Sequence, residues 1–339
     1  MSAAAGRRRV AVMGTGSWGT AFSQVLADAG HEVRLWGRRA ELVRAIRATR
    51  SNPDYLPDLF LQDAVVVTAD ASEALDGADL VVLAIPAQVA RATMRPWASL
   101  VPADATVLSL AKGVERTTTS RMSEVVAEVI GAEKGRIAVL SGPNLSHEVA
   151  ARQPAACVVA SEDPRTAREV AQAVRTGYFR PEVTTDVVGV EIGGATKNVV
   201  AVVVGVAQGL GLGDNTRASL ITRGLAETLR LAVALGGRPR TMEGLAGVGD
   251  LIATCMSPLS RNLSAGIALG QGTSLQEVVD GTLQTAEGVR SSEAILALAQ
   301  VNRVDMPLVE AVVAVVQDGQ QPALVAMTLM SRELKSEKS

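Results

Sequence analysis

One charged side chain in a long apolar stretch is the first candidate for chemistry. In the predicted helix Val187–Gly209, Lys197 is the only charged residue after Glu191. An ammonium group is costly to bury without a partner, so we expect this lysine to be used or neutralised. Gly193 and Gly194 lie below it and leave space for a small molecule or another backbone. The alternative is a core helix whose lysine reaches the surface and whose glycines allow close helix packing.

Asp250 is the predicted partner of that lysine. It lies in residues 244–251, a segment of glycines and apolar residues with no other charge. A carboxylate in such surroundings suggests an opposite charge nearby, and Lys197 is the natural candidate. Together the two would suit proton transfer. The alternative is a helix cap, since aspartate is common at helix N-termini.

A third segment, residues 257–262, has the residue types of an anion site. Ser260 can cap a helix that begins at Arg261, and Asn262 adds an amide. The backbone N–H groups of a helix N-terminus, next to a guanidinium group, favour phosphate binding. The alternative is a well-capped helix without a ligand.

A glycine-rich motif stands near the N-terminus. The sequence GTGSWG (14–19) follows the apolar run 10–13, and a helical pattern to Ala29 and a second strand, 31–36, come after it. This order of strand, turn, helix and strand is the setting in which GxGxxG binds a dinucleotide. The first glycine makes the turn, the second lets the backbone approach the pyrophosphate, and the third permits helix–strand packing. The alternative is a purely structural glycine turn.

The residues after the second strand bear on which dinucleotide binds. Proteins that bind NAD place an Asp or Glu there for the ribose hydroxyls, whereas this sequence has Arg38 and Arg39. Guanidinium groups pair with a 2′-phosphate, so we expect NADP in preference to NAD. The alternative is that both arginines belong to an ordinary exposed turn.

Polar residues also follow several further predicted strands. The candidate strands are 64–68, 80–85, 106–111, 137–140, 157–161 and 179–184, with a helix over 164–176. Lys112, Gly142 and Asn144 come shortly after two of them. Ligands of open parallel sheets bind beyond the carboxyl ends of the strands, so we expect these three residues at the site. Lys112 could equally be a surface lysine.

The strand signals stop at about residue 186, and helices follow. They are predicted over 187–209, 216–235, 242–255, 261–269, 286–299, 307–316 and 322–330. We therefore expect an α/β fold with two domains. Residues 1–186 would form a Rossmann-type, parallel-sheet domain that binds the dinucleotide, and residues 187–335 an all-helical domain that binds substrate and catalyses. The cleft between them is the expected site.

Composition argues against several other functions. The chain has 33 basic and 35 acidic residues, so its formal charge of −2 gives no general attraction for nucleic acid, although a local basic pocket is possible. Cys157 and Cys255 are far apart and only two histidines occur, so we expect neither a disulfide scaffold nor a metal site. The apolar run 10–13 is short for a signal peptide, and the apolar helix falls short of the roughly 20 residues of a membrane span. We expect a soluble, cytoplasmic protein without membrane insertion.

These segments resemble the NAD(P)-dependent glycerol-3-phosphate dehydrogenases of bacterial type, over nearly the whole chain. The resemblance lies in 14–19, 52–57 (NPDYLP), 112–113, 142–144, 191–198 (EIGGATKN), 209–215, 220–224, 244–250 and 257–262. It implies reversible hydride transfer between sn-glycerol 3-phosphate and dihydroxyacetone phosphate with NADP or NAD, supplying glycerol phosphate for phospholipid synthesis. The helical second domain makes a homodimer the expected assembly.

The resemblance also implies roles for individual residues. Lys197 would be the general acid/base, with Asp250 as its catalytic partner. The substrate would be surrounded by Lys112, Gly142, Asn144, Lys197, Asp250, Ser260, Arg261 and Asn262. The positions in contact with the cofactor would be Gly14, Gly16, Ser17, Trp18, Gly19, Arg38, Arg39, Lys112, Ser146, Arg261 and Glu287.

The sequence departs from the commoner family pattern at His147, at 263–265 and at Thr285, which bears on cofactor contacts and turnover. Two other functions stay open. One is a related dehydrogenase acting on another phosphorylated or carboxylated hydroxy compound, since Arg261 would suit either anion. The other is a nucleotide-sensing module without catalysis, which would have no need of Lys197.

Overall fold

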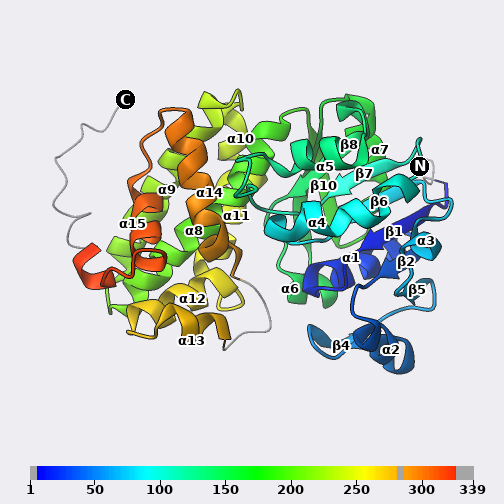
Figure 1. The fold of residues 1–339 in the computed structure, drawn as a ribbon, viewed down its shortest axis with the longest axis horizontal. Coiled ribbons are helices and arrows are strands. Elements are labelled where there is room, and N and C mark those ends of the chain that lie inside the picture. The colour runs from blue at the N-terminus through cyan, green and yellow to red at the C-terminus, as the bar shows by residue number, and fades with distance from the viewer. Residues whose placement is uncertain (1–5, 281–285, 326–339) are drawn as a thin grey trace.

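The computed structural model describes residues 6–280 and 286–325 of the 339-residue chain. Two halves lie side by side (Figure 1): a sheet with its covering helices, and a bundle of helices. The sheet half ends with β10 (Phe179–Thr184), and the helical half begins with α8 (Val187–Gly209). The expected sequence of an α/β half followed by helices is thus confirmed.

The eight strands of the main sheet follow the order β10-β9-β8-β7-β6-β1-β2-β5. Each predicted strand is present within a few residues of its expected bounds. The strands are β1 (Arg9–Met13), β2 (Glu32–Trp36), β5 (Val65–Thr68), β6 (Leu80–Leu83), β7 (Thr106–Ser109), β8 (Ile137–Ser141), β9 (Ala155–Ser161) and β10.

Alternate residues of these strands face two different cores. Val10 and Val12 of β1 belong to one buried cluster, together with Phe22 of α1 (Ser17–Asp28). Ala11 and Met13 belong to another, formed with helices on the opposite face. Because successive strand residues point to opposite faces, a continuous apolar run is what a doubly covered strand requires. The remaining helices of this half are α2 (Ala40–Thr49), α3 (Ala71–Leu75), α4 (Ala90–Met94), α5 (Met122–Ile130), α6 (Ser146–Ala150) and α7 (Pro164–Val174).

The sheet is mainly parallel, as expected, with one antiparallel pair. β9 runs antiparallel to β8, and β10 is parallel to β9, so the last two strands point the other way. The helix between β8 and β9, α6, is short and packs against α1. The chain therefore re-enters the sheet from the end at which it left, instead of crossing back along one face.

A small hairpin that was not predicted extends from this half. β3 (Ser51–Asn52) and β4 (Leu56–Phe60) pair antiparallel, and Ser51 Oγ donates to Pro57 O over 2.6 Å. Asn52 Nδ2 donates to Thr15 O (2.9 Å) and Thr20 Oγ1 (2.8 Å). The hairpin is therefore tied to the glycine-rich segment. β3 has only two residues, and the residues of β4 (LPDLF) do not alternate between apolar and polar, so neither strand gives a period-two signal in the sequence.

The helical half is built around α8, as its composition suggests. Asp186 caps its N-terminus by accepting from Gly189 N (2.9 Å), and α9, α11, α12 and α14 pack around it. The other helices are α9 (Asp214–Ala234), α10 (Pro239–Glu243), α11 (Asp250–Met256), α12 (Arg261–Gly270), α13 (Leu275–Asp280), α14 (Glu287–Val301) and α15 (Pro307–Val316). α13 was not predicted, and most of the expected helix 322–330 lies outside the described residues.

By length and composition α8 could cross a membrane, contrary to expectation. It has 23 residues, and its most apolar window has a mean hydropathy of 1.6. That window is 89% buried inside the protein, however, which is typical of the core helix of a globular fold.

α8 and α12 approach each other closely through glycines on both helices. A methyl group at Gly205 would collide with Leu263 O, and one at Gly266 would collide with Val202 O. Gly209 and Gly270 meet one turn further along. This close approach fixes α12, and hence the residues at its N-terminus, relative to Lys197 on α8.

The predicted helix 242–255 is broken into three parts. α10 ends at Glu243, a π-helical turn spans Leu245–Gly249, and α11 begins at Asp250. Three glycines in seven residues weaken a regular helix, which explains the break. A methyl group at Gly193 of α8 would lie 2.5 Å from Ala246 O. The space at Gly193 is therefore filled by the backbone of this turn, one of the two occupants considered from the sequence, whereas Gly194 faces the Ser141 side chain.

A buried carboxylate joins the two halves. Glu191 of α8 accepts hydrogen bonds from Arg121 Nη1 (2.7 Å), Ser123 N (2.7 Å) and Ser123 Oγ (2.6 Å), all at the start of α5. Arg121 also pairs with Glu124. Glu191 thus caps a helix of the sheet half from within the helical half, and it sits six residues before Lys197.

Replacement of Glu191 by alanine should destabilise the protein by about 3 kcal/mol. The change removes one of the two carboxylates that pair with Arg121 and leaves the Ser123 donors without an acceptor. Denaturant unfolding followed by circular dichroism would measure it. Glu293→Ala is the control, since Glu293 pairs with Arg116 across the same seam but in solvent, at 3.5 Å. That change should cost less than about 1 kcal/mol. Equal losses in the two variants would contradict the special role of Glu191.

Candidate active site

An open cleft of about 400 Å³ lies where the two halves meet. It is lined by the glycine-rich segment, by residues beyond the carboxyl ends of several strands, and by α8, α11, α12 and α14. A cleft between two packed units is the usual place for a small-molecule site. The expected position of the site is therefore where the cavity is found.

Lys197 and Asp250 form a buried ion pair in this cleft, which confirms the contact expected between them. Lys197 is 7% exposed and Asp250 2% exposed, and Lys197 Nζ donates to Asp250 Oδ1. Lys197 Nζ also donates to Thr254 Oγ1 over 2.8 Å, and Thr254 Oγ1 donates to Asp250 O. Since Thr254 follows Asp250 by one helical turn, α11 presents both groups to the amine.

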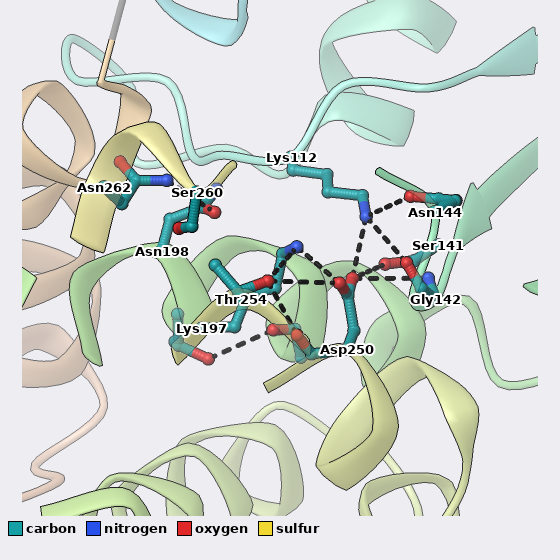
Figure 2. Close-up of polar contacts among 12 residues, drawn as sticks. Lys112, Ser141, Gly142, Asn144, Lys197, Asn198, Asp250, Thr254, Ser260 and Asn262 are labelled. Atoms are coloured by element: carbon teal, nitrogen blue, oxygen red, sulfur yellow. Dashed lines mark hydrogen bonds and ion pairs between the residues drawn. The ribbon is translucent and has the colours of Figure 1, made fainter. Parts of the chain in front are cut away.

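A second ammonium group shares the same carboxylate. Lys112 Nζ donates to Asp250 Oδ2 (2.7 Å), Gly142 O (3.1 Å) and Asn144 Oδ1 (3.0 Å). Ser141 Oγ and Gly142 N each lie 3.3 Å from the same carboxylate oxygen. Figure 2 shows the Asp250 carboxylate reached by Lys112 and by the end of β8. The residues at the ends of the neighbouring strands β7 and β8 thus lie at the site, as their positions after the strands predicted.

Burial and the shared carboxylate shift the pKa of the Lys197 amine in opposite directions. Burial lowers the pKa of Lys197 to about 8; the charge of Asp250 opposes that shift and the charge of Lys112 adds to it. Burial would raise the pKa of Asp250, but the two lysines outweigh it and the pKa is lowered. Asp250 is therefore a carboxylate near neutral pH, and Lys197 can exchange a proton near that pH.

The N-terminus of α12 has the residue types of an anion site and lines the same cleft. Ser260 caps it by accepting from Leu263 N (3.3 Å), as predicted. Arg261 lies in the cleft, where surrounding protein atoms lower its pKa although solvent still reaches the side chain. Asn262 donates to Asn198 Oδ1 (2.9 Å) and accepts from Gly288 N (2.8 Å). Helix N–H groups and a guanidinium group thus face the same space.

The glycine-rich segment has the backbone that a dinucleotide needs. Gly14 has φ +132°, and methyl groups at Gly14 and Gly19 would collide with the backbone at Ala84 and Gly14. A methyl group at Gly16 would meet no described atom within 4 Å, so this backbone faces open space. Buried donors with no partner in the described chain, Asn144 Nδ2 and Trp18 Nε1, belong to residues that line the cleft. These features fit a bound dinucleotide.

The two arginines after β2 differ in their surroundings. Both line the cleft. Arg39 pairs with Asp54 at 2.7 Å and lies over the Tyr55 ring, with its Cζ 5.6 Å from the centroid. Arg38 is exposed. The expectation of two arginines available to a 2′-phosphate therefore fits Arg38, whereas Arg39 already has partners.

Most of the residues expected at the site share this cleft. Gly142 is the exception, since it does not line the cleft; its carbonyl oxygen accepts a hydrogen bond from Lys112 Nζ, which does. The lining residues that agree with the expectation include Ser17, Trp18, Ser146, Arg261 and Glu287. His147 also lines the cleft, and Thr285 lies outside the described residues.

Several lining residues were not predicted, among them Asn198, Thr254 and Tyr55. The spacing of Thr254 from Asp250, one helical turn, could have indicated it. Asn198 directly follows Lys197 in the sequence. Tyr55 gave no signal, because its hairpin was not recognised. Both cysteines are buried, and no cluster of three metal-ligating side chains occurs within 6–280 and 286–325.

Comparison with known families agrees with this geometry. Residues 9–167 match the family described as NAD-dependent glycerol-3-phosphate dehydrogenase N-terminus, and residues 186–327 match the corresponding C-terminus. The chain belongs to the NAD-dependent glycerol-3-phosphate dehydrogenase family. The stretch between the two matched regions, 168–185, contains most of α7 and all of β10.

Curated relatives and a solved structure of this dehydrogenase family cover nearly the whole chain. A glycerol-3-phosphate dehydrogenase [NAD(P)+] of Nocardia farcinica is 56% identical over 97% of the chain and 99% of the relative. One of Streptomyces griseus is 55% identical over 97% and 98%. The crystal structure of glycerol-3-phosphate dehydrogenase from Coxiella burnetii has a TM-score of 0.92 at 34% identity, covering 96% and 99%. The chain is an NAD(P)-dependent oxidoreductase of this family.

Gly16 offers a direct test of the dinucleotide site. Gly16→Ala should leave stability within about 0.5 kcal/mol, because the added methyl group has room. It should weaken NADPH binding by about tenfold or more, because the methyl group occupies the space of the pyrophosphate. Calorimetric titration and denaturant unfolding would measure both.

Gly19→Ala is the matched control, because its methyl group would collide with the Gly14 carbonyl inside the fold. It should destabilise the protein by about 1–3 kcal/mol. Normal nucleotide affinity in Gly16→Ala would rule out this position for the pyrophosphate.

Proposed function

We propose that this chain interconverts dihydroxyacetone phosphate and sn-glycerol 3-phosphate by hydride transfer with NAD(P)H. The observation that carries the proposal is the position of Lys197. Its amine is buried on Asp250 in a cleft that also holds the glycine-rich segment and the N-terminus of α12. A ketone reduction needs a nucleotide site, a proton donor and an anchor for the phosphate, and one cleft contains a candidate for each.

Proton transfer falls to Lys197. In the direction of reduction its ammonium group donates a proton to the carbonyl oxygen at C2 of the substrate, and in oxidation its neutral amine accepts the hydroxyl proton. Asp250 and Thr254 hold the amine in place through the contacts given above. Lys112, on the other oxygen of Asp250, adds positive charge where the alkoxide oxygen forms.

Substrate orientation falls to the α12 N-terminus. Arg261 and the first N–H groups of α12 would bind the phosphate, while Asn262 is held by Asn198 and Gly288 N. Anchoring the phosphate at one end fixes C2 near Lys197, and such positioning can supply much of the rate. When it is bound, the nicotinamide ring of the cofactor supplies the hydride or accepts it. The glycine-rich segment, Trp18 and Arg38 would hold the dinucleotide.

Other parts of the proposal go beyond the reaction itself. We propose a division into residues 1–186 for the dinucleotide and 187–335 for the substrate, with NADP favoured by Arg38. We also propose a cytoplasmic homodimer that supplies glycerol phosphate to phospholipid synthesis. The exposed Ile252 and Met256 of α11 support association through this helix.

A related dehydrogenase with a different hydroxy substrate is the second candidate. Structures of D-mandelate dehydrogenase and of a ketopantoate reductase have TM-scores of 0.58 and 0.55 at 15% and 20% identity, which shows a shared fold alone. The observation that favours it is that Arg261 would bind a carboxylate as well as a phosphate. A panel of phosphorylated and carboxylated ketones would separate the two.

Lys197→Ala should lower kcat for dihydroxyacetone phosphate reduction by roughly 10²–10⁴ while NADPH still binds. In the parent enzyme, kcat for reduction should fall as pH rises through about 8, because the proton donor is lost, and kcat for oxidation should rise. Absorbance assays in both directions across this range would measure the effect. The pH dependence should disappear with the lysine.

Lys112→Ala is the control for this assignment, since Lys112 touches the same carboxylate. It should lower activity but keep a titration in kcat, moved to higher pH because one positive charge beside Lys197 is gone. If this variant lost the titration while Lys197→Ala kept it, the two lysines would have exchanged roles.

Arg261→Ala should raise KM for dihydroxyacetone phosphate, with a loss in kcat/KM of about tenfold to a hundredfold, because a charged hydrogen bond to the phosphate is lost. Activity on unphosphorylated dihydroxyacetone should not change. Steady-state kinetics with both ketones would measure this. Equal losses on the two would show that Arg261 does not contact the phosphate.

A further inference from the structure

Arg39, at the edge of the proposed dinucleotide site, already has two partners of its own. Its Nη2 donates to Asp54 Oδ2 over 2.7 Å, and its guanidinium lies 5.6 Å from the centre of the Tyr55 ring. The side chain of Arg39 is 50% exposed and that of Asp54 is 32% exposed. The guanidinium is thus held in place but still open to a ligand from the cleft.

The turn that carries Asp54 is fixed to the glycine-rich segment. Asn52 Nδ2 donates to Thr15 O (2.9 Å) and Thr20 Oγ1 (2.8 Å), one on each side of the turn into α1. Tyr55 N donates back to Asn52 O over 3.3 Å. The backbone at Asp54 is therefore tied to the segment that would bind the pyrophosphate.

Arg38 has different surroundings from Arg39. It also lines the cleft, it is exposed, and it forms no ion pair with a residue in the described part of the chain. Of two neighbouring cations, one is therefore neutralised by the protein and the other is left for a ligand.

We infer that Asp54 sets the preference between NADP and NAD by competing with the adenosine 2′-phosphate for Arg39. The inference rests on the proposed dinucleotide site. A 2′-phosphate beside Arg39 must share the guanidinium with a carboxylate and is repelled by that carboxylate. A 2′-hydroxyl carries no charge and meets no such penalty. Asp54 thus weakens the preference that two free arginines would give, and Arg38 provides most of the remaining affinity for NADP.

The test isolates the 2′-phosphate from the rest of the reaction. Binding of 2′,5′-ADP and of 5′-ADP is measured by calorimetric titration for the parent and for Asp54→Asn. The variant should bind 2′,5′-ADP about two- to fivefold more tightly, the range expected for a half-exposed ion pair. Its affinity for 5′-ADP should stay the same. Equal changes for both nucleotides, or none, would overturn the inference.

Asp58→Asn is the matched control. Asp58 is an exposed residue of β4 on the same hairpin, so this change removes the same charge without touching Arg39. It should leave the ratio of the two affinities as in the parent. A gain for 2′,5′-ADP equal to that of Asp54→Asn would mean that only net charge matters, which contradicts competition for Arg39.

The double variant Arg39→Met with Asp54→Asn tests whether Asp54 affects nucleotide binding through Arg39. The gain for 2′,5′-ADP should vanish, because the guanidinium that Asp54→Asn released is absent. Survival of the gain would show that Asp54 does not act through Arg39. These titrations need no turnover, so loss of the proposed reaction would not change them, whereas failure of both nucleotides to bind would contradict the dinucleotide site itself.

Discussion

Two ammonium groups share one buried carboxylate in this protein, and the rest of the site depends on that arrangement. Asp250 is 2% exposed, and Lys197 and Lys112 bind its two oxygens. A buried charge is tolerated only when it is paired and hydrogen-bonded, and here one carboxylate satisfies two cations. The cluster therefore keeps one excess positive charge that faces the cleft. An anionic substrate, or an oxygen that becomes negative during reaction, would neutralise this charge.

Each member of the cluster comes from a different part of the fold, which explains several otherwise unrelated features. Lys112 follows β7, Lys197 lies on α8, and Asp250 follows the π-helical turn. The turn can approach α8 only because Gly193 has no side chain there. Glu191 then joins α8 to α5 of the other half. The π-helical turn and the buried Glu191–Arg121 ion pair between the two halves thus both help to position the amine of Lys197.

Much of this could be predicted from the sequence, because the signals were local. An unpaired-looking charge in an apolar segment identified Lys197 and Asp250, and polar residues after strands indicated Lys112 and Asn144. What failed depended on non-local packing. The antiparallel β9 follows from α6 lying against α1, and the position of the π-helical turn depends on its contact with α8 at Gly193. The hairpin with Tyr55 was missed because β3 has only two residues and the five of β4 (LPDLF) do not alternate between apolar and polar.

The same logic of charge balance applies across the cleft, and it suggests why the nucleotide and substrate ends differ. At the substrate end the cations outnumber the carboxylate bound between them, so a phosphorylated ketone meets net positive charge. At the proposed adenosine end, Asp54 pairs with Arg39, one of the two arginines. Since exposed ion pairs contribute little to stability, this pair is better understood through its effect on a ligand than through its effect on folding. A site built in this way would discriminate strongly for the substrate's phosphate and only moderately for the cofactor's, which suits a chain whose relatives are named for both nucleotides.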